Sequence, residues 1–172
     1  MLSLACGDPE REYTGVSYSR FVLPFPCTPA WTRCLSDITR REHDRLVFFL
    51  GGTDLEMLTI RTLLEETIPG RFHDKHLVWG AKASAYGEEI GEALDAGKTP
   101  VLVELEDDVG LDREAVVITD HHGERAGSDK PTSLHQIFAL LGLPAKRWTR
   151  WFDLVAANDR GYIAEMQRSG SV

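Results

Sequence analysis

Short apolar runs and longer amphipathic segments alternate along the chain from residue 46 onward. Residues 46–50 form a continuous apolar run that ends at Gly51 and Gly52. This pattern is typical of a strand that is buried on both faces of a parallel sheet. Three further apolar runs predict three more strands, over residues 76–79, 101–103 and 115–119.

Segments with helical spacing separate these runs. Leucine and isoleucine residues recur at near-helical spacing over residues 55–64, and Pro69 and Gly70 end the pattern. A second helix is predicted over residues 83–96, and Gly97 closes it. The strands and helices therefore alternate through the first half of this region.

Two more helices are predicted toward the C-terminus. The first begins at Pro131-Thr132-Ser133 and ends at Gly142. The second covers residues 145–157, and Asn158 ends it. Its apolar side is expected to carry Trp148, Trp151, Phe152 and Val155. Because strands that alternate with helices favour right-handed crossovers, we predict an α/β fold with a mostly parallel sheet and helices on both faces.

Residues 1–44 have a more heterogeneous pattern. Prolines at positions 24, 26 and 29 interrupt it, and the recognisable features are a strand over residues 18–23 and a short helix over residues 36–43. We therefore expect an N-terminal extension over residues 1–44 and an α/β domain over residues 45–172.

Composition narrows the class of protein. The chain has 172 residues, 42% of them hydrophobic, which suits one globular domain. A formal net charge of -8 argues against stable binding of duplex nucleic acid, which needs a basic surface. No apolar run approaches the roughly 20 residues of a membrane-spanning helix, and no signal-peptide pattern is present. We expect a cytoplasmic protein that can form a homodimer and whose Cys6, Cys27 and Cys34 are reduced thiols.

Acidic residues and histidines follow the predicted strands. Asp54 and Glu56 follow the first strand, Glu104 follows the third, and His121 follows the fourth. Ligands of parallel sheets bind beyond the carboxyl ends of the strands, so these side chains should face one crevice. Clustered carboxylates repel one another unless a cation lies among them, and oxygen ligands mixed with imidazole suit manganese, magnesium or iron.

Each of these residues also has a purely structural interpretation. Asp54 and Glu56 are what a helix favours in its first turn, and the histidines can hydrogen-bond to loop carbonyls. Lys82 is either a phosphate contact or an exposed lysine at a helix start. Arg160 either stabilises charge in a transition state or lies on the surface.

One motif resembles a known family. The stretch Val-Ile-Thr-Asp-His-His, residues 117–122, ends an apolar run shortly before the Pro-Thr-Ser helix start. It looks like the third motif of the DHH phosphoesterase superfamily, whose members hydrolyse pyrophosphate, polyphosphate and nucleotide phosphodiesters. The resemblance covers roughly residues 45–163 and implies a Rossmann-like DHH domain.

The resemblance implies roles for individual residues. It makes Asp54, Glu56, Glu104, His121 and Asp159 ligands of one or two manganese or magnesium ions. It makes His122 the histidine that meets the substrate and Asp120 its supporting aspartate. Asp159 would lie in an Asp-x-Gly turn after a helix. The chain departs from the family pattern where Leu50 takes the place of the first-motif histidine and where Glu56 and Glu104 replace aspartates. We also expect no C-terminal substrate-binding domain in this sequence, which is either a fragment of a longer protein or a minimal variant.

Three functions are consistent with this sequence. The first is a metal-dependent phosphoesterase that hydrolyses a phosphoester or phosphoanhydride in a small phosphorylated substrate, such as a nucleotide, an oligonucleotide or a polyphosphate. Its catalytic residues would be His122, Asp120 and Arg160. The second is a non-catalytic nucleotide- or metal-binding module with a degenerate site. The third is a receiver-like domain that signals through Asp107 or Asp108.

Overall fold

The computed structural model describes residues 43–123 and 130–168. The predictions for residues 1–42, which include a strand over 18–23, nearly all of a helix over 36–43 and the three cysteines, lie outside the described residues. The boundary between the extension and the domain therefore stays a prediction.

Four parallel strands form one sheet in the order β2-β1-β3-β4. Their bounds are Leu46–Leu50 for β1, Phe72–Asp74 for β2, Thr99–Val103 for β3 and Val117–Thr119 for β4. The α/β prediction is confirmed. The chain passes from β1 to β2, which pairs with one edge of β1, and then crosses back to β3, which pairs with the other edge of β1. The order therefore reverses between β1 and β3, which is where ligands of parallel sheets bind.

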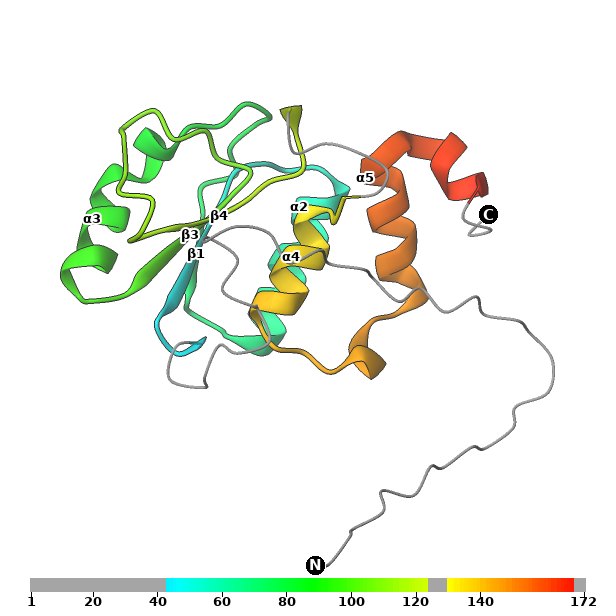
Figure 1. Cartoon of the computed structure of the whole chain (residues 1–172), viewed down its shortest axis with the longest axis horizontal. Helices are drawn as coiled ribbons and strands as arrows, with labels where there is room; N and C mark the ends of the chain where they lie inside the picture. Colours follow the sequence, from blue (N-terminus) through cyan, green and yellow to red (C-terminus); the bar gives the residue numbers. More distant parts are fainter. Residues whose placement is uncertain (1–42, 124–129, 169–172) are drawn as a thin grey trace, which may run out of the picture. The chain divides into compact units, whose positions relative to one another are not determined.

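Helices cover both faces of this sheet (Figure 1). Helices α2 (Leu55–Thr67), α4 (Ser133–Leu140) and α5 (Arg150–Arg168) lie on one face, and the 3-10 helix η2 (Ala83–Tyr86) with α3 (Gly87–Asp95) lies on the other. Successive residues of β1 point to opposite faces, as a strand requires. Phe48 and Leu50 pack with α2, α4 and α5, whereas Phe49 packs with Tyr86 and Ile90.

The predicted strand over residues 76–79 is wrong. The second strand is β2, a few residues earlier, and it pairs with β1 from Phe48↔Phe72 to Leu50↔Asp74. Because β2 lies at the edge of the sheet and is only partly buried, it needs fewer apolar residues than β1. The apolar run instead forms a loop in which Val78 and Trp79 are exposed.

The helix predicted over residues 145–157 is also placed incorrectly. A short 3-10 helix, η4 (Ala145–Arg147), comes first, and α5 then continues past Asn158 to Arg168. Burial of Val155, Ala156 and Ala157 against the domain outweighs the weak tendency of asparagine to end a helix. Trp151, which was assigned to the apolar side, is exposed.

No helix within the described ranges is long and apolar enough to cross a membrane.

Candidate metal centre

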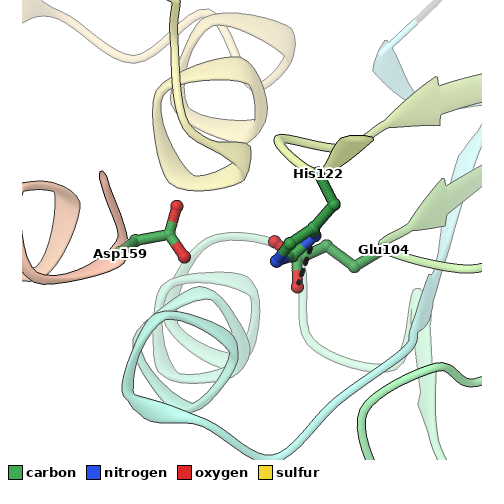
Figure 2. Close-up of side chains that lie close together, drawn as sticks. All are labelled: Glu104, His122 and Asp159. Atoms are coloured by element: carbon green, nitrogen blue, oxygen red, sulfur yellow. Dashed lines mark ion pairs between the residues drawn. The ribbon is translucent and has the colours of Figure 1, made fainter. Parts of the chain in front are cut away.

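Three polar side chains meet at the carboxyl edge of the sheet. Glu104 follows β3, His122 follows β4, and Asp159 belongs to α5. One ligand atom from each lies within 4.8 Å of the other two. Figure 2 shows the Asp159 carboxylate pointing from α5 toward Glu104 and His122. We call these three residues the triad.

The backbone at the switch point between β1 and β3 is tightly constrained. A Cβ atom on Gly51 would overlap the carbonyl group of Glu104 and lie 2.6 Å from the carbonyl oxygen of Val103. Glu104 itself has a φ of 53°, a left-handed conformation that costs a non-glycine residue about 1–3 kcal/mol. Its N–H donates to Thr119 O at 2.8 Å, which fixes this conformation. Such strain concentrates at functional sites, where it aims a side chain.

The N-terminus of α4 holds two of the carboxylates. The Leu134 N–H donates to Glu56 Oε1 at 2.9 Å, and the Ser133 hydroxyl donates to Glu104 Oε1 at 2.8 Å. The positive end of the helix dipole adds to the attraction. The predicted helix start at Pro131-Thr132-Ser133 therefore also forms one wall of the site.

Asp54 and Glu56 have different surroundings at the start of α2. Asp54 caps the helix, because its Oδ1 accepts from the Met57 N–H at 2.8 Å. Glu56 lies in the first turn, but its side chain is turned inward and the residue is only 2% exposed. The purely structural interpretation thus describes Asp54, which caps the helix, and not Glu56, whose buried side chain is turned into the site.

Burial raises the pKa of three carboxyl groups at this edge. Burial and the charge of Asp159 raise the pKa of Glu56 from 4.5 to about 9. Burial also raises the pKa of Glu104 and of Asp159. Ser133 and His122 partly offset this rise at Glu104. His121 and His122 partly offset it at Asp159. Among the described residues, neither Glu56 Oε2 nor Asp159 Oδ2 has a hydrogen-bond partner. The hydrogen bonds at this edge are therefore too few to stabilise all three carboxyl groups in their charged forms.

The two adjacent histidines occupy different environments. His122 is held by Asp120, whose Oδ1 lies 2.9 Å from its N–H and 3.0 Å from its Nδ1. Burial lowers the pKa of His122, but Glu104 and Asp120 together outweigh it, so the pKa is raised. His121 is 5% exposed, and its Nδ1 lies 3.2 Å from Pro131 O. This contact holds the His121 ring beside the start of α4.

The predicted metal ligands are thus brought together in part. The triad contains Glu104 and Asp159, but its histidine is His122 and not His121. The other three predicted ligands lie near the triad. The charge of Asp54 raises the pKa of Glu104 and of Asp159, and His121 lowers that of Asp159. The pKa of Glu56 is in turn raised by the charges of Asp159 and Glu104. Asp159 reaches the site from within α5, so its expected position in a turn after a helix is wrong. On α5 it lies one turn after Val155, and therefore on the face that packs against the domain.

Two basic residues predicted for the site lie in different places. Arg160 is close enough to Asp159 and His135 to lower the pKa of both. Lys82 Nζ lies 4.0 Å from Glu106 Oε2, and both side chains are exposed. No interaction found among the described residues connects Lys82 to the triad.

The acids Asp107 and Asp108 hold loops in place. Asp107 Oδ1 accepts from the Gly110 N–H at 2.9 Å, and Asp108 accepts from the Ser84 N–H at 2.9 Å and from its hydroxyl at 2.6 Å. Asp107 is therefore a turn residue, whereas Asp108 ties its loop to η2, 24 residues earlier in the chain.

Ser133 and Trp79 belong to the site but were not predicted as site residues. Ser133 was assigned only to a helix start, and its contact with Glu104 joins positions 29 residues apart. The Trp79 ring centroid lies 6.5 Å from that of His122. Trp79 ends the apolar run over residues 76–79, and that run predicted a buried strand, so the exposure of Trp79 was not expected.

Comparisons of the chain with protein-family models, with curated proteins and with solved structures find no match. The resemblance to the DHH phosphoesterases stays a prediction from the motifs of this chain.

Proposed function

We propose that this domain binds a divalent cation at the triad and hydrolyses a phosphoester or phosphoanhydride bond. The observation that carries the proposal is the convergence of Glu104, His122 and Asp159, with ligand atoms within 4.8 Å of one another. They meet at the edge of a parallel sheet where its strand order reverses.

The chemistry of these donors fits such an ion. Two carboxylates and an imidazole suit manganese or magnesium. The raised pKa of Glu104 and of Asp159 indicates that burial disfavours their charged forms, and a positive ion among them would remove that penalty. Within the described part of the chain, Asp159 Oδ2 is buried and has no hydrogen-bond partner, and the charges of His121, His122 and Arg160 offset the effect of burial only in part.

The bound ion would neutralise charge on the phosphoryl oxygens and make a water molecule more acidic. The water oxygen bonds to phosphorus while the bond from phosphorus to the leaving oxygen breaks. Glu56 is the residue we assign to accept the water proton, because its Oε2 has no hydrogen-bond partner among the described residues. Its pKa, about 9 without a cation, falls when positive charge binds nearby. The leaving oxygen takes a proton from solvent, since the His122 side chain at this edge is 42% exposed.

A second function is favoured by Leu50. This residue takes the place of the first-motif histidine of the resembled family, and its side chain is completely buried in the apolar core beneath α2. It supplies no ligand, so the ion has fewer protein donors than in a full DHH site. A metal- or nucleotide-binding module without hydrolysis is the function that this observation supports.

The test is a titration of chelator-treated protein with Mn²⁺ by calorimetry, combined with hydrolysis of bis(p-nitrophenyl) phosphate. We expect one or two ions to bind per chain. Glu104→Gln and Asp159→Asn should each weaken binding at least tenfold, by analogy with the loss of a metal-site residue. Glu56→Gln should reduce hydrolysis more than it reduces Mn²⁺ binding, because Glu56 lies outside the triad.

The matched control is Asp95→Asn, which removes one negative charge at an exposed position at the end of α3. This variant should bind and hydrolyse like the wild type. Folded wild-type protein that binds neither Mn²⁺ nor Mg²⁺ would refute the proposal. Binding without hydrolysis would refute the enzyme and support the binding module.

A further inference from the structure

Trp79 is an exposed aromatic residue beside the triad. The residue is 80% exposed and its neighbour Val78 is 74% exposed. Its ring lies 6.5 Å from that of His122, at an interplanar angle of 83°. The perpendicular contact uses a small part of the indole surface and leaves the rest open to solvent.

The loop that carries Trp79 is anchored at both ends. On the β2 side, the Lys75 N–H donates to the Tyr86 hydroxyl at 2.8 Å, and that hydroxyl donates to Leu50 O at 2.8 Å. On the other side, the Glu106 N–H donates to Ala81 O at 3.0 Å. The exposure of Trp79 therefore belongs to a loop with defined ends.

Two left-handed residues flank the exposed pair. His76 has a φ of 52° and Gly80 a φ of 78°. The His76 N–H donates to Asp74 Oδ1 at 2.7 Å, which holds the first of these turns. The left-handed conformation of a histidine is unfavourable by itself. The backbone thus turns sharply on both sides of residues 77–79, and the Trp79 side chain between these turns is exposed to water.

An indole in water gives up the free energy that its burial would contribute. Trp79 and Val78 form an adjacent exposed apolar pair beside the polar triad, and apolar patches with a polar rim are typical of binding sites. Flat aromatic rings pack well on an indole, and every nucleobase has a face that can stack in this way. The chain carries a net charge of -8, so it is poorly suited to attract a long polyanion but can accept a small ligand through an aromatic face.

We propose that Trp79 stacks on the nucleobase of a nucleotide whose phosphate is cleaved at the triad. This inference rests on the proposed function and assigns Trp79 the role of determining specificity. The reaction is hydrolysis: water adds to the phosphorus of a nucleoside phosphodiester, the bond to the alcohol oxygen breaks, and a nucleoside monophosphate and an alcohol leave. Trp79 takes no part in bond breaking and acts by holding the base.

Two substrates with the same reacting group test the proposal. One is the methyl ester of adenosine 5′-monophosphate, and the other is the methyl ester of ribose 5-phosphate, which lacks the base. Both are assayed with Mn²⁺ on the full chain, using wild type, Trp79→Ala, Trp79→Phe and Trp151→Ala. Trp151 is the matched control because it is an exposed tryptophan, 51% accessible, in a groove between α2 and α5 that includes none of the triad.

Trp79→Ala should raise KM for the nucleotide ester about tenfold, a factor that corresponds to about 1.4 kcal/mol and falls within the range of base stacking. It should leave the ester without a base unchanged. Trp79→Phe should restore most of the loss, and Trp151→Ala should show none. The calorimetric affinity for adenosine 5′-monophosphate should change in parallel with KM.

The outcomes separate this inference from the proposed function. Equal effects of Trp79→Ala on both esters, or no effect on either, would overturn the stacking role while hydrolysis stands. Failure of the wild type to hydrolyse either ester, with adenosine 5′-monophosphate still bound in a manner that depends on Trp79, would refute the hydrolase and retain the stacking role. Absence of both activity and nucleotide binding would refute both.

Discussion

Replacing Glu56 by glutamine should stabilise the cation-free protein at neutral pH. Glu56 is 2% exposed, and burial with the nearby charge of Asp159 raises its pKa from 4.5 to about 9. At pH 7 the folded protein therefore keeps a proton on Glu56, whereas the unfolded chain has released it. The free energy of unfolding consequently falls as the pH rises from 4.5 toward 9.

The size of this effect follows from the interval between the two pKa values. A pH of 7 lies about 2.5 units above the unfolded pKa and still below the folded one, and each unit corresponds to about 1.36 kcal/mol. The ionisable carboxyl therefore lowers the free energy of unfolding by about 3 kcal/mol at pH 7. Glutamine cannot ionise, and it keeps an oxygen that can accept from the Leu134 N–H, so Glu56→Gln should avoid this loss.

The measurement is urea denaturation in the presence of a chelator at pH 5, 6, 7 and 8. The difference between Glu56→Gln and the wild type should grow by about 1.36 kcal/mol for each pH unit in this range. Glu65→Gln is the control, because Glu65 lies on the same helix with its side chain 55% exposed. Its curve should stay parallel to that of the wild type. Parallel curves for Glu56→Gln as well would show that Glu56 is ionised in the folded protein and would refute the reasoning.

Two further predictions concern the frame of the site. Gly51→Ala should lower the free energy of unfolding by about 1–3 kcal/mol, because the added Cβ overlaps the Glu104 carbonyl. Thermal unfolding measures this loss, with Gly91→Ala as the control because a Cβ at Gly91 meets no atom within 4 Å. Equal losses of stability in the two variants would contradict the prediction. Burial and then the charge of Arg160 lower the pKa of His135 to about 4, so the unfolded chain binds more protons below pH 6.5 and stability falls from there toward pH 4. His135→Gln should flatten this decline in urea denaturation, and an unchanged slope would argue that His135 is charged when folded.

The sequence determined those parts of the protein that depend on short stretches of chain. The apolar runs that became β1 and β3 mark strands buried on both faces, and because every strand of a parallel sheet ends at the same edge, Glu104 and the residues after β4 had to lie there. The bounds of α2 and α4 follow from helical spacing and from proline and glycine at their ends. These features need little information from distant residues.

Tertiary structure alone decided which side chains meet. Whether His121 or His122 joins Glu104 depends on how the chain turns after β4, where Asp120 binds one histidine and Pro131 the other. Asp159 reaches the site because burial of its neighbours carries α5 past the asparagine that was predicted to end the helix. The large rise in the pKa of Glu56 arises from burial beneath α4. Glu56 accepts a hydrogen bond there from the Leu134 N–H, and the two residues are 78 positions apart in the sequence. Local patterns report the preferences of neighbouring residues, whereas proximity, desolvation and charge at this site come from contacts between distant segments that only the folded chain brings together.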